Sequence, residues 1–370
     1  METKLWREYD YILAGCVTIL VIFGTTMVYT ATFNNGPLQI LFPRHIINVI
    51  VGLVGMVIFT VFDYRQLSGL ARPLYIGIIG LLLLVHVSGE VSSGAQSWIN
   101  LGARTIQPSE FAKIVMIIVL AAYWSRFEQN LDDIRVHIGS LLLIGVPMIL
   151  VLLQPDFGTA LVFAAIWLAM AVTAGLRWYY LLGLCVLAIP ACYLGWWYVL
   201  EDYQRTRLST FYWLLVDPSL VDRTDEAYNI IQSLNAISAG GLFGTGLGRG
   251  LMSQGSYIPV QYSDFIFAVV GEELGFVGSC ALLLFLGLLL WSTLNIAERT
   301  KHLFGRLIVV GVFGMSLCHI LVNIGMNMSI MPVTGIPLPF ISYGGSFTIT
   351  MLVAIGLIES IAMRGKGMTF

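Results

Sequence analysis

Carboxylate side chains interrupt an otherwise apolar run between Gln261 and Gly275. The run contains Asp264, Glu272 and Glu273, and a carboxylate can remove a proton from a hydroxyl group or bind a divalent cation. Burying an uncompensated carboxylate at membrane depth costs on the order of several kcal/mol, so such a residue is a functional candidate. Asp is also a favoured N-cap residue, and Asp264 would then only begin the following helix. Position alone leaves both interpretations open.

A second candidate lies between Gly102 and Lys113, where an acidic and a basic residue stand three positions apart. Pro108 favours the first turn of a helix, and Glu110 suits the positive N-terminal end of its dipole. Lys113 then lies on the same helix face as Glu110 and can pair with it. Spacing alone favours a structural pair, whereas a paired Glu and Lys just inside a membrane favours a functional one.

Asp156 lies in a tight turn, Gln154 to Thr159, whose Pro155 and Gly158 break the neighbouring helices. Its carboxylate can satisfy backbone amides of that turn, and this structural interpretation is at least as strong as a role in substrate binding.

Three arginines, Arg104, Arg205 and Arg207, are candidates for binding a pyrophosphate, because guanidinium groups bind phosphate oxygens bidentately. They could equally be solvated surface charges. The glycine-rich run from Gly240 to Gly250 is similar to a phosphate loop, but no GK[ST] follows it and no βαβ unit surrounds it. We therefore expect no nucleotide cofactor.

The elements that position these residues must be membrane helices. Of the 370 residues, 58% are hydrophobic and 11% are charged, where a soluble domain has about 25% charged residues. The mean hydropathy is +0.85. Apolar runs recur without an intervening polar domain, which predicts a single polytopic membrane domain over 1–370. A net charge of −2 provides no basic surface for nucleic acid, and the five separate cysteines predict neither a disulfide nor a zinc site.

A helix needs about 20 apolar residues to cross the hydrocarbon layer, which predicts about ten transmembrane helices in an all-α integral membrane protein. The span near 110–124 is short and is expected to begin inside a protein-lined cavity. Residues 265–299 are too many for one crossing, so their first part should lie at the interface or line an outer cavity. The predicted spans are 11–31, 45–62, 72–88, 110–124, 138–153, 160–175, 178–199, 274–296, 305–328 and 346–363.

The basic residues predict the orientation of these spans. Twelve of the nineteen Lys and Arg residues fall on the inner side when the N-terminus is cytoplasmic, so both termini are expected inside. The unusual segments, 89–109, 154–159, 200–264 and 329–345, then face outward. Function is expected on the outer face. The large extracytoplasmic loop 200–264 and the 329–345 loop should meet around one outward-facing cavity, because both contain irregular backbone.

Four motifs in this order resemble the SEDS family of membrane proteins: Gln107-Pro-Ser-Glu110, Gln154-Pro-Asp-Phe-Gly-Thr159, Asp264-Phe-Ile-Phe-Ala268 with Glu273-Leu-Gly275, and Pro337-Leu-Pro-Phe-Ile-Ser-Tyr-Gly-Gly345. Any one string is a weak signal, but four in order over the whole chain are specific. The short termini and the Ser93-Gly-Ala-Gln-Ser-Trp98 segment are more similar to the RodA branch, which serves elongation, than to the FtsW branch, which serves division.

The resemblance implies a peptidoglycan glycosyltransferase that polymerises lipid II at the outer leaflet of the bacterial cytoplasmic membrane, for elongation and cell shape. It implies a class B penicillin-binding protein and other elongation-complex membrane proteins as partners. Asp264 matches the family's essential aspartate, and Glu110 and Lys113 match a required pair. Asp264 would then act as a base or as a ligand of a divalent cation, Mg²⁺ or Mn²⁺. Lys113, held in place by Glu110, would contact the phosphates together with Arg205 and Arg207.

Two other functions fit the same composition. A flippase or secondary transporter for the lipid-linked precursor would also carry polar residues in its spans, but here those residues concentrate on the outer side. A non-enzymatic scaffold for wall-building proteins would leave Asp264 dispensable.

Overall fold

The computed structural model describes residues 8–34, 36–88, 90–92, 95–100, 105–198, 200, 202–217 and 226–365. Within these ranges nine helices are long and apolar enough to cross a membrane, and a tenth apolar helix, Phe157–Thr173, is shorter. The predicted number of about ten spans is therefore confirmed. They are α2 (Tyr11–Phe33), α3 (Leu41–Val61), α4 (Leu67–Ser88), α5 (Pro108–Arg126), α6 (Ile134–Leu152), α7 (Phe157–Thr173), α8 (Trp178–Tyr198), α12 (Ile266–Arg299), α13 (Leu303–Asn327) and α14 (Gly345–Gly365).

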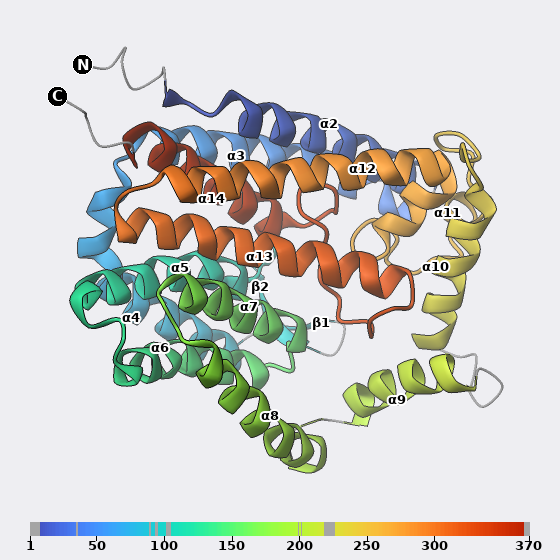
Figure 1. Cartoon of the computed structure of the whole chain (residues 1–370). Coiled ribbons are helices and arrows are strands. Elements are labelled where there is room, and N and C mark those ends of the chain that lie inside the picture. Colours follow the sequence, from blue (N-terminus) through green and yellow to red (C-terminus); the bar gives the residue numbers. More distant parts are fainter. Residues whose placement is uncertain are drawn as a thin grey trace.

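The centre of the bundle is formed by α5, α13 and α14, whose side chains are largely buried, while α4 and α8 turn most of theirs outward (Figure 1). An outward-facing apolar side chain is stable in lipid, so these outer helices need no polar face. The central helices carry the polar segments singled out in the sequence, and they are the ones best shielded from lipid.

Three predictions, on the short span, on the long loop and on the absence of strands, need correction. The short span is α7, with 17 residues, whereas α5 is a full crossing of 19 residues. The 200–264 loop is mostly helical, because it contains α9 (Asp202–Val216), α10 (Glu226–Gly240) and α11 (Leu251–Gln254). Between α4 and α5 lies a small antiparallel sheet of β1 (Glu90–Ser92), β2 (Ala95–Asn100) and β3 (Thr105–Ile106), which the all-α prediction did not include.

Short 3₁₀ turns follow α2, α3 and α5, at Gly36–Leu38, Tyr64–Gln66 and Glu128–Asn130.

The long helix α12 is broken at Gly275, where φ is +66°. Eight of the nine residues before the break, Ile266 to Glu273, are buried by protein, with the side chains of Glu272 and Glu273 fully enclosed. The 265–299 run is therefore divided, as its length indicated, and its first part packs inside the protein instead of lying at the interface. That it lines an outer cavity stays a prediction.

The glycine-rich run from Gly240 to Gly250 seals that break. The amides of Thr245 and Gly246 donate to the carbonyls of Glu272 and Glu273, each at 3.0 Å. Phe276 and Val277, in turn, donate their amides to carbonyls of the run. Backbone groups at membrane depth must be satisfied by protein, so the run has a structural role.

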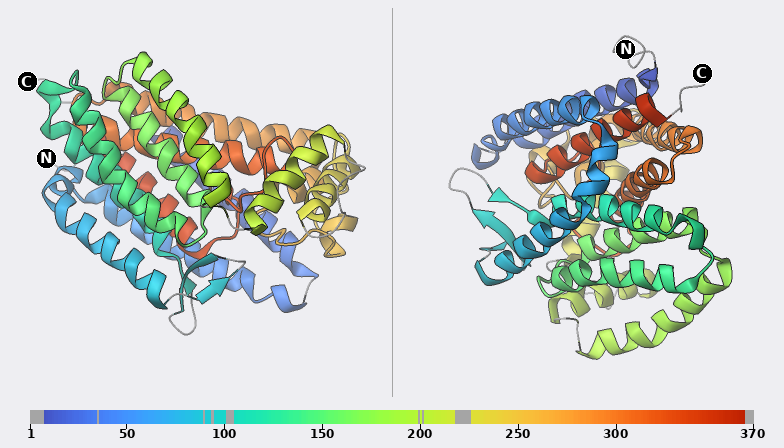
Figure 2. Two further views of the ribbon diagram at one scale, coloured as in Figure 1. Left: turned by 90° about the horizontal axis from the view of Figure 1, so that it is seen from below. Right: turned by 90° about the vertical axis from the view of Figure 1, so that its left-hand side faces the viewer.

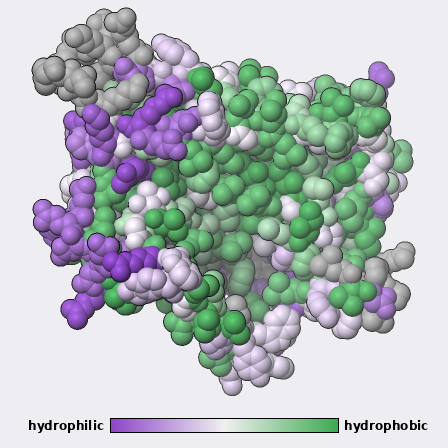
Figure 3. All heavy atoms as spheres, viewed as in Figure 1, coloured by the Kyte–Doolittle hydropathy of each residue, from purple (hydrophilic) through white to green (hydrophobic). Residues whose placement is uncertain are grey.

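Both termini lie at one end of the bundle, and α9 and α10 lie at the other (Figures 1 and 2). Hydrophilic residues gather at the end that holds the termini, beside a broad apolar belt (Figure 3). There Arg364 donates to the carbonyl of Thr60 and Arg65 donates to the carbonyl of Arg364, which ties α3 to α14. The cysteines Cys16, Cys185, Cys280 and Cys318 are free, as predicted.

Candidate active site

Glu110 and Lys113 form a buried ion pair at the start of α5. Pro108 opens the helix, and Glu110 lies in its first turn, as predicted. The Lys113 ammonium lies 2.7 Å from the Glu110 carboxylate, and the side chains of Lys113 and Glu110 are 1% and 5% exposed. The predicted pairing is confirmed. Because both charges are enclosed by protein, each needs the other to offset its loss of hydration.

A third member of this cluster, His319 of α13, was missed by the sequence analysis. Its Nε2 lies 3.1 Å from the Lys113 ammonium, and its Nδ1 lies 3.0 Å from the Pro337 carbonyl oxygen. The Lys113 ammonium also lies over the ring of Phe347, 5.4 Å from its centre. The signal that could have revealed His319 is its spacing from Asn323 and Asn327, because residues four apart share one helix face.

Those two asparagines hold the backbone of Asp264. The Asn323 and Asn327 side-chain amides each donate to the Asp264 carbonyl oxygen at 3.0 Å. Asn323 also donates to the carbonyl of Ile336, at 2.7 Å, and the Asn327 side-chain oxygen accepts the amide of Ala268. A single face of α13 therefore reaches both the ion pair and the segment that carries Asp264.

The half-buried side chain of Asp264 stands one residue ahead of the N-cap position of α12, which is held by Phe265. The Asp264 carboxylate accepts a hydrogen bond from the Ser263 hydroxyl at 3.0 Å. Asp264 is therefore not at the position that the capping interpretation requires. This carboxylate remains the candidate base or metal ligand.

The loop before α14, residues 328–344, lies against the segment that carries Asp264. The Ser342 hydroxyl donates to the Ser263 carbonyl at 2.7 Å, and the Tyr343 amide donates to the Tyr262 carbonyl at 2.8 Å. The predicted contact between the 200–264 and 329–345 segments is confirmed. Burial raises the pKa of Tyr262, and the negative charge of Asp264 raises that pKa further.

The other two carboxylates of the run have structural partners. Glu272 accepts the amides of Met252 and Ser253, at 2.7 and 2.9 Å, so it caps α11 from a distant part of the chain. Glu273 accepts a hydrogen bond from the Gln254 side chain at 3.2 Å. These bonds account for two acidic residues that the sequence left without a role.

Asp156 is the N-cap of α7, and its carboxylate accepts the Thr159 amide at 2.9 Å. The structural interpretation of this turn is thus confirmed. The same carboxylate accepts a hydrogen bond from Gln107 at 3.1 Å, which links the turn to the start of α5. A role of Asp156 in substrate binding stays a prediction.

The structure describes two of the three candidate phosphate-binding arginines. Arg205 and Arg207 are half-buried residues of α9, and Arg205 donates to the Trp197 carbonyl at 3.1 Å. Gln204 of the same helix contacts the Pro155 carbonyl at 3.5 Å, which sets α9 beside the Asp156 turn. Arg104 lies outside the described residues.

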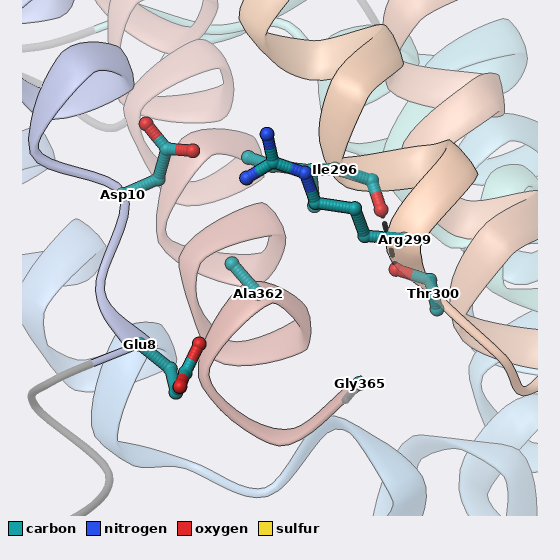
Figure 4. A pocket seen from close by; sticks show the side chains of 7 residues that line it. All are labelled: Glu8, Asp10, Ile296, Arg299, Thr300, Ala362 and Gly365. Carbon is teal, nitrogen blue, oxygen red and sulfur yellow. Dashed lines mark hydrogen bonds between the residues drawn. The ribbon is translucent and has the colours of Figure 1, made fainter. Parts of the chain in front are cut away.

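The surface is hollowed between α8 and α9, below the end of α13 (Figure 3). A separate shallow pocket lies at the end of the bundle that holds the termini, where Glu8, Asp10 and Arg299 are among the lining residues and Asp10 points toward Arg299 (Figure 4). That pocket is at the opposite end of α12 from Asp264.

The donor atoms near Asp264 were compared with the needs of a divalent cation. Among the residues that the structure describes, no three His, Cys, Asp or Glu side chains gather closely enough to hold a metal ion. Mg²⁺ is commonly held by only one or two carboxylates together with water and substrate phosphates. Asp264 would supply one such carboxylate, so a cation there would need its other ligands from water or from a bound molecule.

Residues 9–367 match the FTSW_RODA_SPOVE family model, described as a cell cycle protein. The chain is 38% identical to the peptidoglycan glycosyltransferase MrdB of Escherichia coli over 355 residues, 94% of each chain. It is 33% identical to a probable peptidoglycan glycosyltransferase FtsW of Geobacter over 373 residues, 97% of this chain and 98% of the other.

Two solved structures are also similar to the chain. One belongs to a peptidoglycan synthase complex that coordinates polymerization and crosslinking, with 33% identity, a TM-score of 0.80, and 96% and 97% of the two chains covered. The other is the rod shape determining protein RodA of Thermus thermophilus, with 30% identity, a TM-score of 0.70, and the same coverage.

Proposed function

The chain belongs to the FtsW/RodA/SpoVE family, and we infer from this that it is a peptidoglycan glycosyltransferase that polymerises lipid II. The single observation that carries the proposal is the convergence of three distant family motifs on α13. One face of this helix contacts Lys113, the Pro337 segment and the backbone of Asp264. The enzyme is a multi-pass membrane protein, because its apolar helices are long enough to span a bilayer.

The reaction joins two lipid-linked sugars. The 4-hydroxyl oxygen of one sugar forms a bond to the anomeric carbon of the other, and the bond from that carbon to undecaprenyl pyrophosphate breaks. The hydroxyl proton must be removed and the negative charge on the departing pyrophosphate must be stabilised. We assign the first task to the Asp264 carboxylate, whose half-buried side chain is within reach of a substrate.

Stabilisation of the leaving group is assigned to α9. Arg205 and Arg207 are half-buried, whereas Lys113 is buried. A guanidinium group also binds phosphate oxygens in a bidentate geometry. Lys113 and Glu110 are enclosed by protein, so we assign them the task of positioning the site from within. A divalent cation held by Asp264 and substrate oxygens would supply further positive charge at the pyrophosphate.

The orientation and the partner follow as further parts of the proposal. Basic residues at the end that holds the termini favour a cytoplasmic location for that end, which sets Asp264 at the outer face. The similarity to a chain of a synthase complex that couples polymerization to crosslinking supports a class B penicillin-binding protein as partner. The identities to MrdB and FtsW proteins, 38% and 33%, are similar, so the elongation role rests on the likeness of the Ser93 to Trp98 segment to the RodA branch.

The proposal is tested by incubating the purified protein, with its partner, with lipid II and separating the products by size. Glycan polymer is the expected product, and its amount should rise with the protein concentration. A protein that only moves lipid II between vesicle leaflets, with no polymer formed, would contradict the proposal.

A further inference from the structure

Three buried polar side chains of α13 join the two halves of the candidate site. His319, Asn323 and Asn327 follow one another at intervals of four residues, so they share one face of the helix. Each is at most 1% exposed. Buried polar groups are retained at a cost unless they are hydrogen-bonded, and these three are bonded on several sides.

The two neighbours of His319 fix the position of its proton. An ammonium group can only donate, so Nε2 of His319 must accept from Lys113. A carbonyl oxygen can only accept, so Nδ1 must carry the proton and donate to Pro337. The neutral ring therefore satisfies both neighbours at once, and each ring nitrogen has one assigned partner.

The His319 ring links the Glu110–Lys113 pair to the loop that lies beside Asp264. The Glu110 and Lys113 side chains belong to α5, whereas Pro337 belongs to the loop before α14. Two residues before Pro337, Gly335 lies against the Asp264 carboxylate. A shift of His319 would therefore move the loop relative to the ion pair.

We propose that His319 is a positioning residue for glycosyl transfer, which ties the Glu110–Lys113 pair to the loop beside Asp264. The proposal rests on the proposed function and adds a residue to it. His319 acts through Lys113 and Pro337 and does not touch the reacting atoms. Loss of its two bonds should therefore lower turnover and leave the affinity for lipid II nearly unchanged.

Three substitutions separate the two bonds of His319. His319→Leu removes both of them. His319→Asn places an amide near the Nδ1 position and retains the bond to Pro337, whereas His319→Gln reaches the Nε2 position and retains an acceptor for Lys113. Displacements of about 1 Å can cost about 100-fold in rate, so we expect His319→Leu to lower kcat at least about tenfold with KM changed by less than about twofold.

Both amide variants should recover part of the lost kcat. The matched control is Ser316→Ala, which alters another buried polar residue of α13 that lies outside this cluster and should leave kcat unchanged. A His319→Leu enzyme with wild-type kcat, or with a change confined to KM, would overturn the proposal. So would Asn and Gln variants no more active than the Leu variant.

A second measurement does not depend on activity. Thermal unfolding of the detergent-solubilised protein is compared for Lys113→Met, His319→Leu and the double variant. If the two side chains are bonded, the double variant should lose less in Tm than the sum of the two single losses. Additive losses in Tm would contradict the proposed bond between His319 and Lys113. A wild-type protein that makes no polymer would refute the proposed function, and that result is distinct from either outcome of this cycle.

Discussion

Gly335 lies beside Asp264 so closely that a Cβ atom at position 335 would be 3.5 Å from Oδ2 of the carboxylate. The φ angle of Gly335 is +71°, a conformation that residues with a side chain rarely adopt. The loop before α14 therefore meets the carboxylate through a residue that leaves the space beside it open.

Gly335→Ala is expected to lower polymerisation at least about tenfold, since the positive φ strains a residue with a side chain and relief of that strain displaces the loop at Asp264. Gly175→Ala provides a matched control, because Gly175 has a φ of +95° and open space around it. That control should lose stability and retain activity. Equal activity losses in the two variants, measured as the initial rate of polymer formation, would contradict the role of Gly335.

Asp264→Asn should abolish polymerisation, with a loss of at least about 100-fold, because the substitution keeps the size of the side chain but removes its basicity and charge. Folding should be retained, since Phe265 holds the N-cap of α12. Asp133→Asn is the control, because Asp133 caps α6 and Asn caps about as well as Asp. An Asp264→Asn protein that polymerises lipid II at close to the normal rate would refute the catalytic assignment.

Removing either charge of the Glu110–Lys113 pair should destabilise the protein more than removing both. A single uncompensated buried charge costs about 3–5 kcal/mol, and Glu110→Gln combined with Lys113→Met leaves none. The exposed pair of Arg177 and Asp132, 3.2 Å apart, serves as a control, because water screens its charges and its removal should change stability little. The free energy of unfolding of the solubilised protein is measured for the single and double variants of both pairs. Additive losses of stability at Glu110 and Lys113 would count against the buried pair.

Chelation tests the shared cation. We expect EDTA to lower polymerisation at least about tenfold and added Mg²⁺ or Mn²⁺ to restore it, because a pyrophosphate and one carboxylate together suit such an ion. Full activity in EDTA would instead identify Asp264 as a base that works alone. Asp264→Asn should not be restored by either metal.

Cysteine labelling in intact cells tests the orientation. In a variant whose five cysteines are replaced by alanine, Asn130→Cys should react with a membrane-impermeant maleimide only after lysis, and Ser256→Cys should react before it. Both positions are exposed in the structure, and they lie at opposite ends of the bundle. Labelling of residue 130 from outside would overturn the proposed topology.

Much of this fold follows from apolar segments that are long enough to span a bilayer. The sequence also predicts the Glu110–Lys113 pair, because residues three apart on a helix meet. The helices α9, α10 and α11 were missed because each has at most 15 residues, which is too short for the roughly 20-residue crossings that the apolar runs revealed. The spacing of His319 from Asn323 and Asn327 marks a polar helix face, but the partners of His319 follow only from packing, because Lys113 and Pro337 are distant from it in sequence.

The break at Gly275 has a consequence for how the protein is made. The 24 residues from Phe276 to Arg299 form an ordinary apolar span that can enter the bilayer by itself. The residues before them carry two acidic side chains and backbone groups whose bonds are made by the Gly240 to Gly250 run. Lipid cannot replace those bonds. We therefore expect two steps at this helix during biosynthesis: the span inserts first, and its outer portion docks once α10 and the glycine run are in place.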